Sequence, residues 1–497
     1  MIIFKNLYLT FFGQEVFADV SFIINKKDKI GLIGRNGSGK TTLLKMLNNE
    51  VQPDNGEILK PKNYKIGYLK QHIHFTKDNV MEEAYLALPE HEKDSLWLAD
   101  KILTGLGFSE DDFLSNPNDL SGGWQIRLNL AKILISDPDL LLLDEPTNYL
   151  DITTIRWLKR FLKSWSKELM LITHDKGFMN DVITQAVLIH RKTMFKNKGN
   201  VDDMHVRIAE EEEVHENTRL NQEKQRKKQQ DWIDRFRYKA TLASNVQSRI
   251  KLLEKQETKV KLDKIQNLDF KFNYKDTLAK KLFEAHELEF GYSADKTLIK
   301  NLSFTVNPGD RICVIGKNGT GKSTLLKLLN NFLTPVKGDI NLNPKTEIGY
   351  FGQMNISRLI ESNTILEEMQ SMGPEYSFGQ IRSVCGLMMF SGDAAKKKIS
   401  ILSGGEKSRV VLGKILLQSC NLLILDEPTN HLDMESCEAL TESLHTFKGA
   451  SIVVTHSEEI LKAVATKLIV FDNKKSFVFE GTYQQFLKEV GWSGERK

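Results

Sequence analysis

Two short glycine-rich runs hold residue types that bind phosphate. Residues 34–42 read GRNGSGKTT and residues 316–324 read GKNGTGKST, and both fit the pattern G-x-x-x-x-G-K-[ST]. Glycines let backbone N–H groups turn inward around phosphate oxygens, and the N-terminus of a following helix favours negative charge. The residues predicted to bind the phosphates of ATP are Gly34, Asn36, Gly37, Gly39, Lys40, Thr41 and Thr42 in the first run, and Gly316, Asn318, Gly319, Gly321, Lys322, Ser323 and Thr324 in the second.

The context of both runs supports this interpretation. An apolar strand-like run precedes each one (KIGLIG and RICVIG), and a helix-like run follows it (TLLKML and TLLKLL). A chance glycine-rich turn is the alternative for a single copy, but it does not account for two copies in the same context. We therefore predict two phosphate-binding loops, each lying between a strand and a helix.

An acidic pair follows each loop at the same distance. Asp144–Glu145 and Asp426–Glu427 end the apolar runs LLLLDE and LLILDE, and each Asp lies 104 residues after its loop lysine. A carboxylate at such a strand end can hold Mg²⁺. Because side chains alternate along a strand end, each Glu can reach a water molecule while its Asp reaches the metal. Glu145 and Glu427 are thus predicted to activate the water that attacks the γ-phosphate.

Histidine and glutamine recur at further strand ends in both copies. His174 (LITHD) and His456 (VVTHS) follow the acidic pairs by about thirty residues, and we predict that they act at the γ-phosphate. Gln71 (YLKQ) and Gln353 (YFGQ) could touch Mg²⁺ or the attacking water. The predicted Mg²⁺ ligands are Thr41, Gln71 and Asp144 in the first copy, and Ser323, Gln353 and Asp426 in the second.

One aromatic residue in each copy is a candidate for contact with adenine. Phe12 and Tyr292 lie about two dozen residues before the loops. An aromatic face can hold a base by stacking, so both are predicted to bind ATP, with core packing as the alternative.

The whole chain of 497 residues has a duplicated organisation. An offset of 282 residues relates Gly34 to Gly316, and the same offset relates Ser121 to Ser403 and Asp144 to Asp426. Buried-looking runs such as LLLLD alternate with amphipathic stretches, which predicts an α/β fold with helices on a mostly parallel sheet and an antiparallel flank at the start of each copy. We predict a first domain at 1–195, a linker at 196–282 and a second domain at 283–497.

The linker has the composition of exposed helices. Residues 202–264 lack proline and glycine and are rich in charged residues and glutamine. A break near residues 238–245 is expected to divide them into a helical hairpin. Trp232, Ile233 and Phe236 could face Ile250 and Leu253 along its seam, and we interpret these residues as structural packing.

The motifs together resemble one family. LSGGW at 120–124 and LSGGE at 402–406 are similar to the signature of ATP-binding-cassette ATPases, and DEPTNYLD with DEPTNHLD resembles the ABC-F family, including its ribosome-facing linker. The resemblance covers essentially the whole chain and implies two cassettes that face each other head to tail. It also implies that each ATP lies between the loop of one cassette and the signature of the other. By this resemblance Lys40 works with Ser403, Gly404 and Gly405, and Lys322 works with Ser121, Gly122 and Gly123.

The chain departs from the family pattern at a few positions. Trp124 takes the fifth place of the first signature, and Tyr149 stands at the position where the second copy has His431. Ser457 follows His456, whereas Asp175 follows His174. None of these changes touches a loop lysine or a Glu, so we expect both sites to bind ATP. The interval between Gln and signature is 50 residues in both copies, so a long inserted arm is expected to be missing.

The linker concentrates positive charge. From 224 to 251 nine basic residues oppose two acidic ones, whereas the chain carries only +4 overall. A solvated helical face is the alternative, but a basic hairpin tip on an otherwise slightly acidic protein favours a polyanion such as RNA. The predicted RNA-binding residues are Lys224, Arg226, Lys227, Lys228, Arg235, Arg237, Lys239, Arg249 and Lys251.

Other bulk features limit the class of protein. No stretch approaches a membrane span, and the first residues (MIIFKNLYL) follow a strand pattern without a signal-peptide layout, so we expect the protein to stay in the cytoplasm without membrane contact. The four cysteines lack metal-ligand spacing. The sequence thus predicts a monomeric ATPase that pairs its two cassettes and, by resemblance, binds the ribosome near tRNA and rRNA. Antibiotic protection of the ribosome, an ABC transporter subunit and a DNA-directed ATPase are the alternatives.

Overall fold

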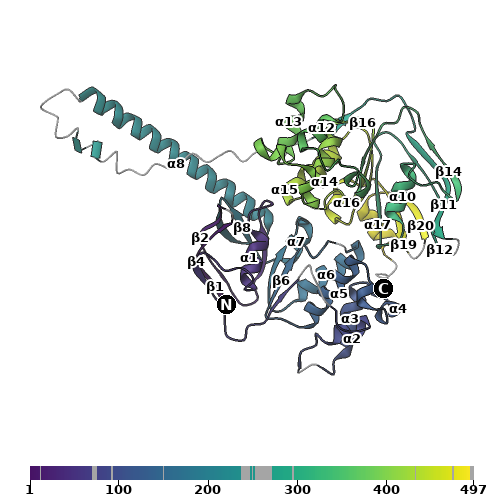
Figure 1. Ribbon diagram of the computed structural model, residues 1–497, viewed down its shortest axis with the longest axis horizontal. Helices are drawn as coiled ribbons and strands as arrows, with labels where there is room; N and C mark the ends of the chain where they lie inside the picture. The colour runs from purple at the N-terminus through teal and green to yellow at the C-terminus, as the bar shows by residue number, and fades with distance from the viewer. Residues whose placement is uncertain are drawn as a thin grey trace.

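The computed structural model describes residues 1–11, 13–69, 75–90, 93–148, 150–236, 247–248, 250–251, 271–293, 296–430, 432–472 and 475–492. Two similar α/β units and one protruding helix make up this part of the chain (Figure 1). Among these residues, no helix combines the length and the apolar character that crossing a membrane requires.

A six-stranded sheet forms the centre of the first cassette. Its order is β5 (Ile66–Tyr68), β6 (Leu140–Asp144), β7 (Glu168–Ile172), β3 (Lys29–Ile33), β8 (Gln185–His190) and β9 (Thr193–Lys198). All neighbouring strands are parallel except β9, which pairs antiparallel with β8. The apolar residues of β6 and β7 are buried because helices pack on one face of the sheet, while one further helix and the strands of a second sheet pack on the other. The predicted mostly parallel α/β core is confirmed.

A second, antiparallel sheet flanks this core. Its order is β2 (Gln14–Ile24), β1 (Ile2–Phe11) and β4 (Asn55–Leu59), which confirms the predicted antiparallel flank. Alternate residues of β1 are buried, as expected for a strand with one face on the core. The helices of this cassette are α1 (Lys40–Leu47), α2 (Val80–Tyr85), α3 (Leu96–Gly105), α4 (Glu110–Phe113), α5 (Gly122–Ile135), α6 (Ile152–Ser164) and α7 (Lys176–Val182).

The second cassette repeats this topology strand by strand. Its central sheet runs β15 (Ile348–Phe351), β17 (Leu422–Asp426), β18 (Ala450–Val454), β13 (Arg311–Gly316), β19 (Lys467–Asp472) and β20 (Lys475–Glu480), and its antiparallel sheet runs β12 (Lys296–Val306), β11 (Phe283–Ser293) and β14 (Lys337–Leu342). The helices are α10 (Lys322–Leu329), α11 (Gln353–Ile356), α12 (Ile365–Gln370), α13 (Phe378–Leu387), α14 (Gly404–Leu417), α15 (Met434–Thr446), α16 (Glu458–Val464) and α17 (Tyr483–Glu489). The short strands β10 (Asn273–Tyr274) and β16 (Ser419–Cys420) pair beside them. The predicted duplication is confirmed.

One long helix, α8 (Val201–Phe236), leaves the first cassette and extends away from both cassettes (Figure 1). Its 36 residues correspond to about 54 Å at 1.5 Å per residue. Ile233 is buried against Trp232 and Ile250, so the return segment packs where the predicted seam lies. The predicted break at 238–245, the side chain of Phe236 and Leu253 lie outside the described residues. The predicted domain limits at 195 and 282 stay a prediction; β9 ends at Lys198.

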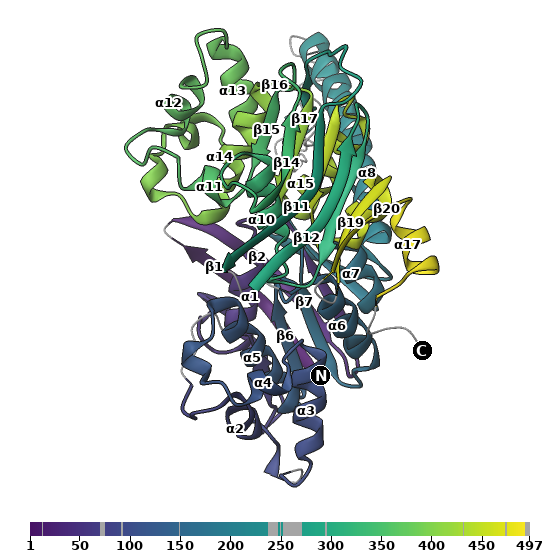
Figure 2. The ribbon, with the colours of Figure 1, turned by 90° about the vertical axis from the view of Figure 1, so that its right-hand side faces the viewer.

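The two cassettes pack against each other through equivalent residues. Ile152, the first residue of α6, is fully buried in the core of the second cassette. Its counterpart Met434, the first residue of α15, is buried in the core of the first. Each cassette therefore inserts one apolar side chain into the other, and the two units lie face to face (Figure 2).

Candidate active sites

The phosphate loops follow β3 and β13 and have the backbone that glycine permits. Gly37 and Gly39 have φ of +82° and +98°, and Gly319 and Gly321 have +75° and +109°. A Cβ at Gly39 would also fall 2.6 Å from a methyl of Val16. Residues that carry a Cβ rarely adopt this conformation, so these glycines keep the loop open before the helix N-terminus. Both loops lead into α1 and α10, as predicted.

Both loop lysines fold back onto their own loops. Lys40 Nζ donates to the backbone oxygen of Gly34 at 2.6 Å and of Arg35 at 3.0 Å. Lys322 Nζ donates to the oxygen of Lys317 at 2.8 Å. Burial lowers the pKa of both ammonium groups, although nearby acidic residues oppose the shift. Each lysine is therefore a buried cation beside the N-terminus of its helix, at the place where phosphate would arrive.

The residues predicted to hold Mg²⁺ form a hydroxyl–carboxylate pair in each cassette. Thr41 Oγ1 donates to Asp144 Oδ2 at 2.8 Å. Ser323 bonds Asp426 in the same way, and burial raises the pKa of Asp426 to about 6. No group of three His, Cys, Asp or Glu side chains suited to a metal occurs among the described residues. One hydroxyl and one carboxylate fit Mg²⁺, which keeps several waters and phosphate oxygens as ligands.

Glu145 lies against His174 at the end of β6. Oε1 is 3.2 Å from His174 Nε2, and the backbone N–H of His174 donates to Oε2 at 3.4 Å. Burial, with Asp144 next to it, raises the pKa of Glu145 to about 8. Its φ of +51° is unusual for a residue other than glycine, and such strain is common at functional sites. The structure therefore brings the predicted base and the predicted γ-phosphate contact together.

Glu427 lies against the equivalent histidine, but its other hydrogen-bond partner differs. Its Oε1 is 3.3 Å from His456 Nε2, and Asn430 Nδ2 donates to Oε2 at 2.7 Å. Burial alone would raise the pKa of Glu427, but the contacts with His456 and Asn430 lower it to about 2. Its φ of +48° matches that of Glu145. The sequence motif DEPTN is identical in both cassettes, so this difference arises from the hydrogen bond that Asn430 makes and from a residue outside the motif. Asp175 adds to the rise in the pKa of Glu145 that burial causes, whereas the second cassette has Ser457 at that place.

The signature residues begin two long helices. Ser121 precedes α5, and Ser403 precedes α14, with open space beside Gly122 and Gly404. Ser403 forms a reciprocal capping box with Glu406, in which Oγ accepts from the Glu406 N–H at 3.3 Å. Gly123 and Gly405 continue the first turns. The open space beside Gly122 and Gly404 leaves room for a phosphate at both helix starts, which the predicted signature role would require.

Trp124 explains why only one signature is capped. It occupies the place of Glu406 and packs edge-on against Phe108, with ring centroids 4.9 Å apart. The Arg127 guanidinium lies 4.5 Å from its ring centre. Ser121 therefore has no side-chain capping bond, and its hydroxyl is not held by its own helix.

A chain of contacts joins the first signature helix to the second phosphate loop. Arg127 on α5 lies 3.7 Å from Asp151, and Asp151 Oδ2 accepts from the backbone N–H of Asn318 at 3.4 Å. Both Asp151 and Arg127 influence the pKa of Lys322. Asp151 was not among the predicted site residues, although its counterpart Asp433 recurs at the same place in the DEPTN…LD motif.

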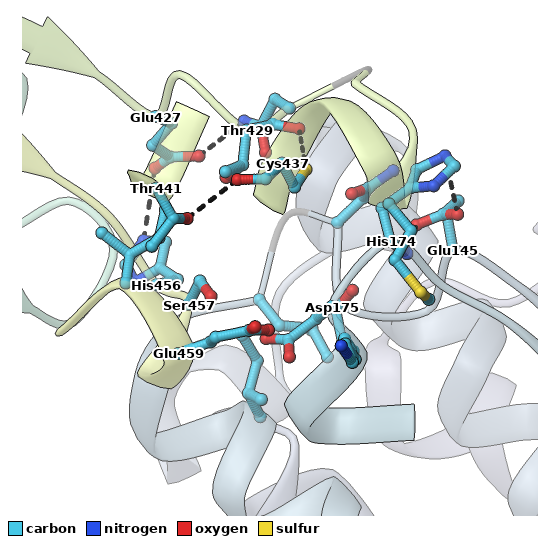
Figure 3. Close-up of a pocket in the computed structure, with 18 of the residues that line it drawn as sticks. Glu145, His174, Asp175, Glu427, Thr429, Cys437, Thr441, His456, Ser457 and Glu459 are labelled. Carbon is cyan, nitrogen blue, oxygen red and sulfur yellow. Dashed lines mark hydrogen bonds and ion pairs between the residues drawn. The ribbon is translucent and has the colours of Figure 1, made fainter. Parts of the chain in front are cut away.

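The two candidate catalytic regions share one cavity at the cassette interface. It encloses about 70 Å³ and is lined by Glu145, His174 and Asp175 from the first cassette and by Glu427, His456 and Glu459 from the second. Figure 3 shows the two Glu–His pairs on opposite sides of it, with Cys437 between them and Thr441 beside the Glu427–His456 pair. A structural change at one site can therefore reach the other site across this cavity.

The remaining predicted residues have mixed outcomes. Tyr292 lies near the end of β11 and is 65% exposed, and its hydroxyl is 3.4 Å from Thr324 Oγ1, so its ring is accessible beside the loop. Gln353 is the first residue of α11, but its side chain lies outside the described part of the chain. The predicted residues that lie wholly outside the described residues are Phe12, Gln71, Arg237, Lys239 and Arg249.

Comparison with known proteins supports the same conclusion. A family described as "ABC transporter" matches residues 17–148 and 299–430, and a second profile of that description matches 187–272. The chain is 34% identical to the probable ATP-binding protein YheS of Escherichia coli K12, over 99% of this chain and 82% of that protein. It is also 34% identical to mouse ATP-binding cassette sub-family F member 3, over 96% of this chain and 72% of that protein.

A solved structure shares the fold. The archaeal ribosome recycling factor aABCE1, solved in complex with the archaeal ribosomal stalk protein aP1, aligns with a TM-score of 0.64 at 18% identity, over 98% of this chain and 92% of that chain. The two cassettes, their repeated sites and the full-length relatives lead to one assignment: the chain is an ATPase that belongs to sub-family F of the ATP-binding-cassette family.

Proposed function

We propose that this ATPase is a cytoplasmic, ribosome-associated factor whose linker acts near tRNA and rRNA. ATP binding draws the cassettes together, their relative position sets where α8 points, and hydrolysis releases the complex. The protein acts as a monomer, in which the two cassettes of one chain pair with each other.

The observation that carries this proposal is the position of Lys176. Its Nζ lies 2.6 Å from Asp202 Oδ1 at the start of α8 and 2.6 Å from Glu438 Oε1 in the second cassette. Lys176 is the first residue of α7, two positions after His174. A single side chain therefore connects the catalytic region, the opposite cassette and the linker helix.

Further contacts hold the start of α8 on the same helix α7. Asn180 Nδ2 donates to Asp202 Oδ2 at 3.1 Å, and Asn180 Oδ1 accepts from the Val201 N–H at 2.9 Å. Glu212, three turns along α8, lies 2.9 Å from His190 and 3.1 Å from Arg191. Because α8 is tied to the cassette over several turns, a rotation of the cassette would swing its far end over a long arc.

Each ATP site supplies the groups that phosphoryl transfer to water requires. Lys40 and Lys322 would neutralise phosphate charge, Glu145 and Glu427 would orient and deprotonate the water, and His174 and His456 would hold the γ-phosphate. When bound, Mg²⁺ would be held by the Thr41–Asp144 and Ser323–Asp426 pairs and would supply neutralisation of charge on the phosphate oxygens.

The surface of α8 suits a polyanion. Lys224, Arg226, Lys227, Lys228 and Arg235 on α8 are exposed, as is Lys251 on the return segment. Charge of this density binds a phosphate backbone with little dependence on base sequence. The similarity in fold to a factor named for ribosome recycling supports ribosomal RNA as the polyanion.

The test uses the full-length Glu145→Gln/Glu427→Gln variant, which should bind ATP and not hydrolyse it. With Mg²⁺ and ATP it should sediment with ribosomes through a sucrose cushion and inhibit translation, whereas ADP should release it. RNase should abolish co-sedimentation and DNase should not. Equal sedimentation with ATP, with ADP and without nucleotide would overturn the proposal.

A further inference from the structure

Within the described part of the chain, four ion pairs connect the two cassettes, and their charges are distributed in the same way. In each of them the cation belongs to the first cassette and the carboxylate to the second. The pairs are Arg35–Glu435 at 2.7 Å, Arg156–Glu458 at 3.4 Å, Lys159–Glu458 at 3.1 Å and Lys176–Glu438 at 2.6 Å. The cations lie on the first phosphate loop, α6 and α7, and the carboxylates lie on α15 and α16.

Two of these pairs occupy equivalent places. The 282-residue offset relates Arg156 to Glu438 and Lys176 to Glu458, just as it relates Ile152 to Met434 in the apolar contacts. The Arg156–Glu458 and Lys176–Glu438 contacts are therefore the two halves of one twofold-like arrangement. Two identical faces in this arrangement would put each residue opposite its partner's equivalent.

The pairing of like faces would bring like charges together. If two copies met through their first cassettes, Arg156 of each copy would face Lys176 of the other. If they met through their second cassettes, Glu438 would face Glu458. Arg156, Lys176 and Glu458 are 24%, 21% and 14% exposed, so screening by solvent is weak at these three side chains, whereas Glu438 is 43% exposed.

We infer that this charge distribution restricts each cassette face to the opposite cassette and excludes pairing between like cassettes of different copies. Like charges placed across an interface discriminate strongly against the wrong partner. The basic interface surface of the first cassette thus fits a partner surface that is acidic, and α15 and α16 of the second cassette in the same chain supply it. This selectivity concerns cassette pairing and does not depend on the ribosome as partner.

One contact between the two cassettes brings like charges together. Asp175 of the first cassette lies near Glu459 of the second, and both line the cavity between the cassettes. Burial, followed by this neighbour, raises the pKa of Glu459, and burial raises the pKa of Asp175. Asp175 also caps α7 by accepting from the Phe178 N–H at 2.8 Å, which accounts for an acidic residue at this place.

The inference is tested by measuring the oligomeric state of full-length variants. The double variant Arg156→Glu/Lys159→Glu places negative charges opposite Glu458 within one chain. Between the first cassettes of two chains, the glutamate introduced at position 156 would face Lys176 of the other copy, so opposite charges would meet there. We expect this variant to form a dimer at about 50 mM salt, by sedimentation velocity, at concentrations at least tenfold below those at which the unmodified chain associates. Adding Glu458→Lys should restore the monomer.

A second variant keeps the test independent of the folding of α6. Glu438→Arg should cause dimerisation through the second face, where the introduced guanidinium would meet Glu458 of another copy. The matched control is Lys5→Glu with Lys192→Glu, because these lysines pair with Glu57 and Glu15 inside the first cassette and away from the interface. Monomers for both interface variants at every salt concentration, or dimers for the control as well, would overturn the inference.

Discussion

Asn430 donates a 2.7 Å hydrogen bond from its side-chain amide to Glu427 Oε2. The equivalent Asn148 lines the same interface cavity, but Glu145 takes its hydrogen bond from the backbone of His174 instead. Identical local sequences therefore hold the two candidate bases differently, and the second is the better fixed of the two.

Removal of this amide should slow the second site. A hydrogen bond to a charged group contributes about 1.5–3 kcal/mol, so Asn430→Ala should lower the ATPase rate of that site roughly ten- to hundredfold. It should also move the acidic limb of activity toward higher pH, because the pKa of Glu427 would rise and the base must be ionised to act. The measurement is a pH–rate profile in a Glu145→Gln background, where only the second site turns over.

Asn148→Ala in a Glu427→Gln background is the matched control. It should change the rate of the first site by less than about threefold, since no hydrogen bond to the base is lost. Equal losses for the two Asn variants would contradict the assigned difference between the sites.

The carboxyl groups of the two candidate bases should affect the free energy of unfolding with opposite signs. Glu145 has a folded-state pKa raised to about 8, so the stability it contributes is present below its unfolded pKa and is lost as the pH rises through 8. Glu427 has a pKa lowered to about 2, so its contribution is present above the unfolded pKa and is lost as the pH falls toward 2.

Thermal unfolding of the nucleotide-free protein measures this difference. At a pH of about 8.5 Glu145→Gln should raise the melting temperature and Glu427→Gln should lower it. Each shift should correspond to a change in the free energy of unfolding on the order of 1 kcal/mol. At a pH of about 4.5 the benefit of Glu145→Gln should disappear, because the carboxyl group is then protonated in the folded state. A shift of the same sign for both variants under the alkaline condition would show that the two environments are alike.

Loss of Lys176 should separate ATP hydrolysis from linker position. Lys176→Ala removes the bridge to Asp202 and Glu438 but leaves the phosphate loops intact, so we expect the ATPase rate to change by less than about threefold. ATP-dependent co-sedimentation with ribosomes should fall at least tenfold, because α8 is no longer tied to the cassette interface.

Lys159→Ala is a control of the same type for this variant. It also breaks a pair across the interface, with Glu458, but its other partner is Asp181 and not a residue of α8. Ribosome binding should therefore be less affected than in Lys176→Ala. If the two variants lose binding equally, the loss comes from cassette pairing and not from the link to α8.

Binding to RNA should depend on salt through the charges of α8. If about six basic residues contact phosphate, affinity should fall on the order of a thousandfold between about 50 and 200 mM salt. Lys224→Gln, Lys227→Gln and Lys228→Gln together should halve the slope of this dependence. The control is the same change at Lys26, Lys27 and Lys62, which are exposed on the first cassette. An equal change of slope in both triple variants would argue against contact through α8.

Much of the fold and most of the ATP-site chemistry could be predicted from the sequence because they depend on local patterns. A phosphate loop spans nine residues, and buried parallel strands appear as short apolar runs, so residue type and spacing alone identify Lys40, Asp144, Glu145 and their counterparts. The constant offset of 282 residues established the duplication, and the structure repeats the same strand order in both cassettes.

Long-range contacts could not be predicted in this way. Lys176 and Glu438 are 262 positions apart, and nothing near Lys176 in the sequence distinguishes it from any exposed lysine. Asp151 ends a repeated motif, but its contact with Asn318 could not be predicted either, because it exists only where the cassettes face each other.

The sequence by itself determined which residues could perform the chemistry and how often the unit repeats, since those properties depend on residue type and spacing. Only the tertiary structure decided how the two copies differ, because burial and hydrogen-bond partners come from chain segments distant in sequence. Thus identical DEPTN motifs give Glu145 a pKa of about 8 and Glu427 a pKa of about 2, and faces related by duplication carry opposite charges where they meet.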